Sequence, residues 1–190
     1  MVTALDIREL NAAHEATVVA ALAPLFEGAP RFLARLVAAR PFGDWPALFG
    51  VAREIAHAMP ENEQVELIDA HPRLGAPPAT VSALSFREQG YDRATAEDTA
   101  AGGTSAERAV GTAELERQRV AAELERLNEA YEARFGFRYC VFVAGRSRAE
   151  LLPQMVAALD ADRDDELHRA LDAVVDISMA RLETLRAAGT

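Results

Sequence analysis

The fold of this chain is decided by residues 112–134, which read TAELERQRVAAELERLNEAYEAR. Five large apolar side chains recur there at spacings of three to five residues: Leu115, Val120, Leu124, Leu127 and Tyr131. These positions fall on one side of an α-helix, and most of the others are charged or small. The segment therefore predicts a long amphipathic helix over residues 112–134.

Helical spacing of apolar residues extends over most of the chain on both sides of this segment. Asp44 followed by Pro46 is a helix start signal, and Pro72 ends a helix because the residue before a proline is pushed out of the α region. Ser147 and Glu150 have the spacing of a capping box. The further predicted helices are 10–25, 32–37, 44–59, 65–70, one that begins at Ser85, 147–159 and 165–186.

Two segments depart from the helical pattern. Residues 135–143 are rich in β-branched and aromatic side chains, which is typical of a strand, although a single strand has no partner in a helical chain. The alternative is an extended segment buried among helices. Residues 90–111 are poor in large hydrophobic side chains and predict a flexible insertion. We expect one all-α domain over residues 1–187, a bundle of about eight helices with a short extended buried segment at about 135–143.

The composition limits the binding partners and the cellular compartment that we expect for this chain. The chain has 190 residues, half of them hydrophobic and 26% charged, which is the balance of a globular protein. The formal net charge of −10 argues against binding to nucleic acid or to an anionic membrane surface, whereas a small anion could still bind at a local arginine. There is no apolar run long enough for a membrane span and no secretory signal pattern, so we expect a cytoplasmic protein.

Two residue counts exclude classes of chemistry. All twenty basic residues are arginine, so no lysine is present to form a Schiff base, and mechanisms based on pyridoxal phosphate or a lysine imine are excluded. Cys140 is the single cysteine, which cannot form an internal disulfide or build a thiolate metal site. The chain also lacks metal-ligand spacings, phosphate-binding glycine loops and nucleophile elbows, and we expect no metal.

Three places in the sequence are candidates for chemistry, and each has a structural alternative. His71 ends an apolar helix before Pro72, where it either caps the helix or exchanges a proton near neutral pH. Ser85 and Glu88 have capping-box spacing, and a helix N-terminus that carries them could also present donors and a carboxylate to a ligand. Arg181 lies on an apolar helix, where it either pairs with a carboxylate such as Glu88 or holds an acidic substrate.

Short blocks of sequence in a fixed order resemble a known family along nearly the whole chain. They are Leu10-Asn11, Phe26-Glu27, Pro30, Arg40-Pro41-Phe42, Leu67-Ile68, Ala70-His71-Pro72, Leu74-Gly75, Ser85, Glu88-Gln89, Leu127-Asn128, Tyr131, Phe135-Gly136-Phe137, Ile177 and Arg181-Leu182. In these blocks the chain resembles the decarboxylases of 2-oxo-4-hydroxy-4-carboxy-5-ureidoimidazoline (OHCU), which act in urate degradation. The resemblance implies an all-helical homodimer that converts OHCU to (S)-allantoin and carbon dioxide without a cofactor.

The resemblance also implies roles for particular residues. The catalytic histidine of the family falls on His71, and its buried arginine falls on Arg181; with Glu88, these are the predicted catalytic residues. The predicted substrate contacts are Pro72, Ser85, Phe86, Arg87, Gln89, Tyr139, Cys140, Val141, Phe142 and Val143. The substrate would be a small anionic heterocycle whose own ring imine accepts the electron pair left by carbon dioxide, which suits a chain without lysine.

Two further interpretations remain open at this point. The residues after Gln89 are Gly90, Tyr91 and Asp92, where the family has Ala-Gly-Leu, and this altered loop suggests an enzyme of the same fold that acts on a different ureido or hydantoin acid. The other alternative is a helical interaction module that has kept the fold without turnover. Retention of His71, Glu88 and Arg181 favours an enzyme.

Overall fold

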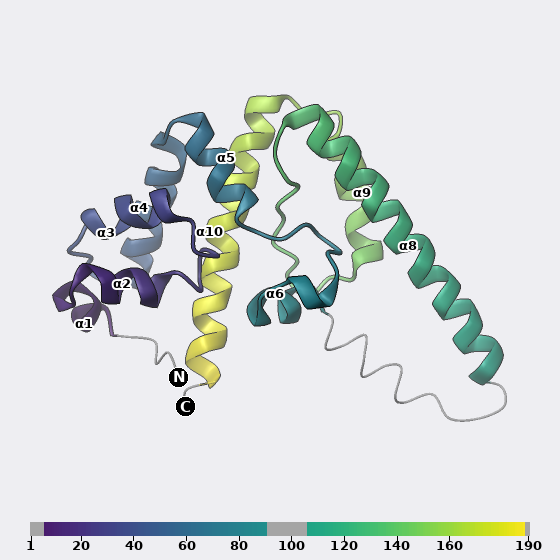
Figure 1. The fold of residues 1–190 in the computed structure, drawn as a ribbon, viewed down its shortest axis with the longest axis horizontal. Helices are drawn as coiled ribbons and strands as arrows, with labels where there is room; N and C mark the ends of the chain where they lie inside the picture. Colours follow the sequence, from purple (N-terminus) through teal and green to yellow (C-terminus); the bar gives the residue numbers. More distant parts are fainter. Residues whose placement is uncertain (1–5, 91–105, 189–190) are drawn as a thin grey trace. The chain divides into compact units, whose positions relative to one another are not determined.

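The computed structural model describes residues 6–90 and 106–188, with side chains described for residues 6–90 and 114–187. Over these residues the chain forms nine α-helices and one 3₁₀ turn, and no strand (Figure 1). The predicted all-α class is thereby confirmed. The chain divides into two compact units, which we call unit 1 (Met1–His71, Cys140–Phe142 and Arg163–Thr190) and unit 2 (Pro72–Tyr139 and Val143–Asp162).

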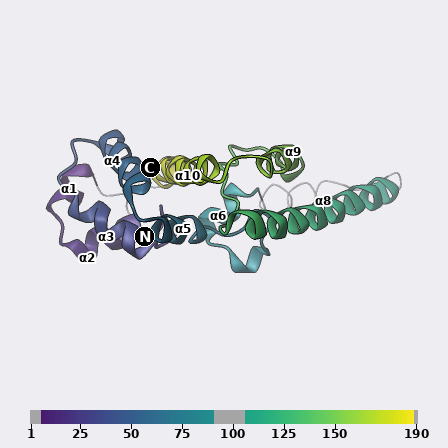
Figure 2. The ribbon, with the colours of Figure 1, turned by 90° about the horizontal axis from the view of Figure 1, so that it is seen from above.

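Unit 1 is built around its C-terminal helix. Its helices are α1 (Ile7–Ala12), α2 (Glu15–Leu22), α3 (Pro30–Ala38), α4 (Trp45–Ala58), α5 (Glu61–Asp69) and α10 (Arg163–Ala188). Helix α10 packs against α4 and α5, while α3 packs against α2, α4 and α5 (Figure 2). Arg53 of α4 forms ion pairs with Asp172 and Asp176 of α10, which adds a polar contact at the edge of this packing.

The single helix predicted over residues 10–25 is wrong, because the structure has α1 and α2 there. Ala13 and His14 have extended backbone conformations, with ψ of 154° and 148°. The guanidinium of Arg40 donates hydrogen bonds to the carbonyl oxygens of Leu10 and Ala13, at 3.3 and 2.8 Å. These contacts with distant residues satisfy carbonyl groups that a continuous helix would have used, so α1 ends where they begin.

The helix start and stop signals of α4 are confirmed. The Asp44 carboxylate accepts a hydrogen bond from the Ala47 N–H at 2.7 Å, and the helix ends at Ala58 with Met59 as its C-cap, just before Pro60. The predicted helix before His71 is α5, which begins at Glu61, four residues before the predicted start. Capping chemistry and proline positions therefore predicted these boundaries well, because both act within a few residues of the helix end.

Unit 2 contains the 3₁₀ turn η1 (Pro78–Thr80) and the helices α6 (Ala83–Glu88), α8 (Ala106–Phe135) and α9 (Arg148–Ala158). Helix α8 packs against α9, and it starts six residues before the predicted Thr112. Of its predicted apolar side, Leu124, Leu127 and Tyr131 are buried, whereas Leu115 is 67% exposed. The prediction for Leu115 is wrong because apolar spacing shows which side of a helix is buried but not where along the helix the core ends. Residues 91–105 of the predicted insertion lie outside the described residues.

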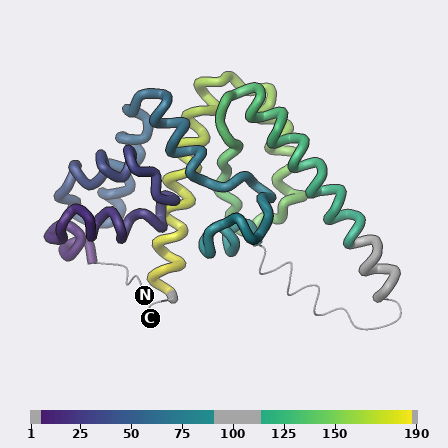
Figure 3. The backbone as a smooth tube through the Cα atoms, in the orientation of Figure 1, coloured from purple at the N-terminus to yellow at the C-terminus, as the bar shows by residue number. Residues whose placement is uncertain are grey.

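The segment between α8 and α9 has no helix or strand (Figure 3). Most of the side chains in residues 137–143 are buried, which confirms the alternative of a buried non-helical segment. Within unit 2, Phe137 and Tyr139 pack against Tyr131 of α8, with ring centroids 5.8 and 5.1 Å apart. The aromatic composition that suggested a strand therefore reflects burial rather than strand pairing. No described helix is both long enough and apolar enough to cross a membrane.

Candidate functional site

His71 lies at the end of α5 and is 96% buried, since its exposed fraction is 4%. Its backbone N–H donates to the Ile68 carbonyl at 3.0 Å, which continues the last helical turn past the C-cap Ala70. Its ring Nδ1 lies 3.4 Å from the Leu67 carbonyl oxygen. Because a carbonyl oxygen only accepts, Nδ1 carries the hydrogen, and Nε2 of the neutral ring is then the acceptor nitrogen.

The surroundings of His71 keep its imidazole neutral. Its pKa is lowered to about 4, chiefly by burial and also by the positive charge of Arg181, while Glu27 and the Leu67 carbonyl oppose the shift. A helix C-terminus favours the charged form of a histidine, and desolvation outweighs that effect here. At neutral pH the ring is therefore a buried proton acceptor rather than an imidazolium.

Arg181 of α10 is the other predicted catalytic residue in unit 1, and it is only 1% exposed. It forms an ion pair with Glu27 at 2.8 Å and donates to the carbonyl oxygens of Pro24 and Leu25 at 3.1 and 3.3 Å. A carboxylate partner was one of the two alternatives for this arginine, and Glu27 is such a partner, while an ion pair with Glu88 and contact with an acidic substrate remain predictions. A buried guanidinium needs such partners because its desolvation is costly.

Glu27 is a residue of this site to which the sequence analysis assigned no role. It has a φ of +50° and is followed by Gly28 with a φ of +77°, so the chain turns sharply between α2 and α3. This turn presents the Glu27 carboxylate and the Pro24 and Leu25 carbonyls to one guanidinium. The sequence signals for it were its place in the family block Phe26-Glu27 and its position directly before a glycine at a helix break. His71, Arg181 and Glu27 thus form one buried electrostatic cluster in unit 1.

The predicted role of Ser85 as a helix cap is wrong. The N-cap of α6 is Ser82, whose Oγ accepts a hydrogen bond from the Ser85 N–H at 3.2 Å and donates one to the Ser85 Oγ at 3.2 Å. Ser85 is the third residue of the helix and is buried, with an exposed fraction of 1%. Glu88 is the last residue of α6 and is half-buried, as is Phe86, while Arg87 is exposed. The helix therefore begins three residues earlier because the preceding serine supplies the cap.

Gln89 connects the end of α6 to the loop that follows His71. Its Oε1 accepts a hydrogen bond from the Gly75 N–H at 2.8 Å, and its Nε2 donates to the Arg73 carbonyl at 3.2 Å. Asn128 of α8 binds the residue between them, since its Nδ2 donates to the Leu74 carbonyl at 3.0 Å. All these residues belong to unit 2. No role was predicted for Asn128, although a buried asparagine within the apolar side of a helix is unfavourable unless it has such a partner.

The predicted backbone contacts over residues 139–143 lie in the buried non-helical segment. Tyr139, Cys140, Val141 and Val143 are buried and Phe142 is half-buried. Within unit 1, the Cys140 carbonyl accepts a hydrogen bond from Arg169 of α10 at 3.0 Å, and Arg169 also pairs with the buried Glu166. This contact fixes part of the segment without a neighbouring strand.

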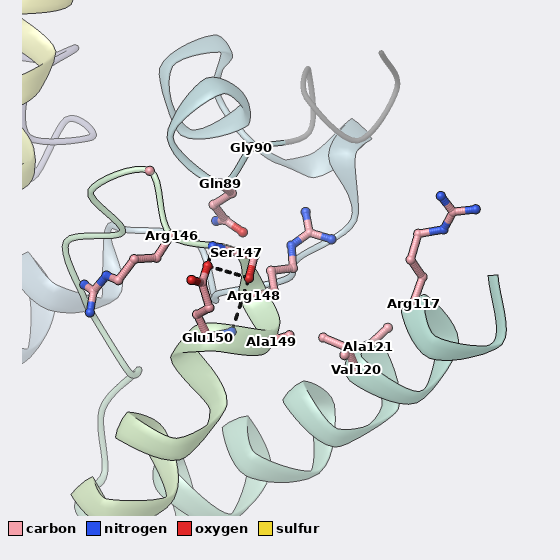
Figure 4. A pocket seen from close by; sticks show the side chains of 11 residues that line it. Gln89, Gly90, Arg117, Val120, Ala121, Arg146, Ser147, Arg148, Ala149 and Glu150 are labelled. Carbon is pink, nitrogen blue, oxygen red and sulfur yellow. Dashed lines mark hydrogen bonds between the residues drawn. The ribbon is translucent and has the colours of Figure 1, made fainter. Parts of the chain in front are cut away.

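Unit 2 also contains a cavity of about 380 Å³ between the end of α6, α8 and the start of α9 (Figure 4). The cavity is lined by Gln89 and by three arginines, Arg117, Arg146 and Arg148, and Glu150 contributes a carboxylate to the lining. In Figure 4 the side chain of Gln89 reaches toward the start of α9, whereas Arg146 extends away to Gln154, its partner at 2.9 Å. The lining therefore combines three arginines with one carboxylate in a chain whose net charge is −10. Among the described residues, no group of three or more histidine, cysteine, aspartate or glutamate side chains could hold a metal ion.

Comparison with known proteins identifies the family of this chain. The sequence model of the OHCU decarboxylase family matches residues 11–183. The uric acid degradation bifunctional protein PucL of Bacillus subtilis (strain 168) is 30% identical over 92% of this chain and 31% of its own length. This chain therefore spans about a third of that relative. A 2-oxo-4-hydroxy-4-carboxy-5-ureidoimidazoline decarboxylase of Halalkalicoccus jeotgali is 26% identical over 96% of this chain and 93% of its own.

Solved structures share the fold. A crystal structure of OHCU decarboxylase in the presence of (S)-allantoin matches with a TM-score of 0.61 and 18% identity, over 92% of this chain and 99% of that one. A crystal structure of (S)-allantoin synthase also matches with a TM-score of 0.61, at 16% identity over 95% of this chain and 54% of that one. The resemblance seen in the sequence is confirmed by the family match over residues 11–183, and this chain belongs to the OHCU decarboxylase family.

Proposed function

We propose that this chain decarboxylates OHCU to (S)-allantoin and carbon dioxide in urate degradation. The observation that carries the proposal is the family match over residues 11–183, a range that contains His71, Glu88 and Arg181. The buried cluster of His71, Arg181 and Glu27 and the arginine-lined cavity of unit 2 support it, because the substrate is a small anion.

The reaction needs positioning and proton transfer rather than a nucleophile. The bond between the ring carbon and the carboxylate breaks, carbon dioxide leaves, and the electron pair passes to the adjacent ring imine. A proton is then delivered on one face to the neighbouring former imine carbon, which bears the ureido group, and this gives a single stereoisomer. The hydroxyl on the carbon that lost carbon dioxide gives up its proton and becomes a carbonyl. His71 acts as the proton relay, since a neutral imidazole with an acceptor Nε2 can take up a proton and return it.

The other residues orient the substrate and stabilise developing charge. We propose that Glu88 hydrogen-bonds to the substrate or to His71, and that Arg181 contributes positive charge. The further proposed contacts are Pro72, Ser85, Phe86, Arg87, Gln89, Tyr139, Cys140, Val141, Phe142 and Val143. We further propose that the enzyme works as a cytoplasmic homodimer without a cofactor, as the family resemblance implies.

Turnover of freshly generated OHCU tests this function. OHCU is made in situ from urate, and its decay is followed by ultraviolet absorption with and without the protein. We expect the wild-type chain to accelerate the decay, and His71→Asn and Glu88→Gln each to lower kcat by about 10²- to 10⁴-fold, as for loss of a general acid–base group. His14→Asn and Glu54→Gln change exposed residues of the same types and should keep wild-type rates.

Other outcomes decide between the alternatives. No acceleration by a folded wild-type chain would contradict the proposed activity and leave the non-catalytic module. Weak acceleration of OHCU decay, with faster turnover of another ureido or hydantoin acid, would contradict the proposed substrate. Unchanged turnover in His71→Asn would leave the reaction in place and remove the relay role of this histidine.

A further inference from the structure

We infer that Gln89 and Asn128 are positioning residues, which clamp the loop Arg73–Gly75 between α6 and α8 and so fix the end of α6, where Glu88 lies. The loop begins two residues after His71, and Gln89 directly follows Glu88. The inference rests on the proposed function, because the clamp would act on decarboxylation through the position of Glu88, which directly precedes Gln89.

Helix α8 contacts three consecutive loop residues from one of its faces. Leu124, Asn128 and Glu132 are spaced four residues apart, so they lie above one another on the helix surface. Asn128 donates to the Leu74 carbonyl at 3.0 Å, and the Glu132 carboxylate accepts from Arg73 Nε at 2.6 Å and from its terminal nitrogen. Glu132, Asn128 and Leu124 therefore contact Arg73, Leu74 and Gly75 in turn.

Gly75 allows the close approach at the third position. Its φ is +82°, and a Cβ built there would lie 3.0 Å from Leu124 Cδ1. A side chain at position 75 would meet both a left-handed backbone conformation and a closely packed leucine. The glycine thus lets the loop turn directly against α8.

Gln89 holds the same loop from α6. Its carboxamide accepts from the Gly75 N–H at 2.8 Å and donates to the Arg73 carbonyl at 3.2 Å, so it bridges the two ends of the three-residue loop. Asn128 binds the carbonyl between them. Both side chains satisfy backbone groups of an irregular segment, which would otherwise be free to move. This geometry gives Gln89 a role in aligning the loop, in addition to the substrate contact that the resemblance implies.

The test combines steady-state kinetics with hydrogen exchange on the full chain. Gln89→Met and Asn128→Leu keep side-chain size and remove the hydrogen bonds. We expect kcat for OHCU to fall by about 10- to 100-fold, the scale of a small misplacement of catalytic groups, with KM within about twofold of wild type. The Gly75 amide should lose its protection from hydrogen exchange in Gln89→Met. Gln118→Met changes an exposed glutamine of α8 that bonds to Glu114, and it should leave both readouts unchanged.

Gln89→Glu separates the two hydrogen bonds of the clamp. It keeps an acceptor for the Gly75 N–H and loses the donor to the Arg73 carbonyl, so we expect a protected Gly75 amide and a kcat between those of wild type and Gln89→Met. If Asn128→Leu fails to fold, the two Gln89 variants still decide the inference. A higher KM with unchanged kcat and unchanged Gly75 protection in Gln89→Met would overturn it and make Gln89 a substrate contact. An inactive wild-type chain would contradict the proposed function. The clamp would still be tested, because protection of the Gly75 amide is measured without turnover.

Discussion

At the scale of single residues, the most informative group is a histidine whose charge is suppressed by its surroundings. Burial and Arg181 lower the pKa of His71 to about 4, and Glu27 only partly opposes them. The same cluster keeps Arg181 buried, because Glu27 and two carbonyl groups compensate its desolvation. The proton relay that we propose for His71 would therefore depend on a turn between α2 and α3 that lies far from it in the sequence.

The suppressed charge of His71 predicts a loss of stability in mild acid. An unfolded histidine takes up a proton below pH 6.5, and His71 in the folded chain does so only near pH 4, so the unfolded state binds more protons between these values. Above pH 6.5 His71 is neutral in both the folded and the unfolded state, and its contribution to the free energy of unfolding is fully present. The contribution is lost as the pH falls from 6.5 to 4, and the loss of stability reaches about 3 kcal/mol at pH 4.

Urea unfolding at a series of pH values measures this contribution. His71→Asn should lose less stability than wild type between pH 7 and 4, by about 3 kcal/mol. Asn62→Ala, an exposed and non-titrating change, should keep the wild-type pH dependence. Identical pH dependence in wild type and His71→Asn would show that His71 is not buried in its neutral form.

At the scale of helices, caps decide where elements begin. Asp44 caps α4, and Ser147 caps α9 with a capping box in which Glu150 accepts from the Ser147 N–H at 2.7 Å. The corresponding prediction for Ser85 and Glu88 is wrong because Ser82 lies three residues earlier and caps α6. Two serines at cap spacing leave the choice to the packing of the helix, and Ser85 is the one that becomes buried.

The cap of α4 can be tested by Asp44→Ala. The exposed hydrogen bond from the Ala47 N–H would be lost, and we expect the free energy of unfolding to fall by about 1 kcal/mol. Asp160→Ala, a change at an exposed aspartate after α9, should stay within about 0.5 kcal/mol of wild type. Equal stability of the two variants in urea unfolding would mean that water replaces the cap at no cost.

At the scale of the whole molecule, the chain is an all-α protein whose family resemblance implies a homodimer. Light scattering coupled to size-exclusion chromatography should give a mass twice that of the 20.5 kDa chain, independent of dilution over the micromolar range. A mass of one chain at every concentration would contradict the proposed dimer. The His71→Asn variant should have the wild-type mass, since this buried residue is proposed to act in catalysis and not in assembly.

The sequence by itself determined the helical class, most helix boundaries and the family. Apolar spacing, caps and prolines act over a few residues, so α3, α4, α5, α9 and α10 could be predicted from local pattern. The order of short motifs along the chain identified the family without knowledge of their contacts. The absence of lysine excluded imine chemistry directly.

Only the tertiary structure decided which groups share an environment. The break between α1 and α2 depends on Arg40, the partner of Arg181 is Glu27, and Gln89 and Asn128 meet the loop after His71. The pKa of His71 follows from the same contacts, because burial and neighbouring charges outweigh the local effect of a helix end. These contacts join residues that are 14 to more than 150 positions apart, and no local pattern records such pairs, since desolvation and hydrogen bonding depend on distance in space.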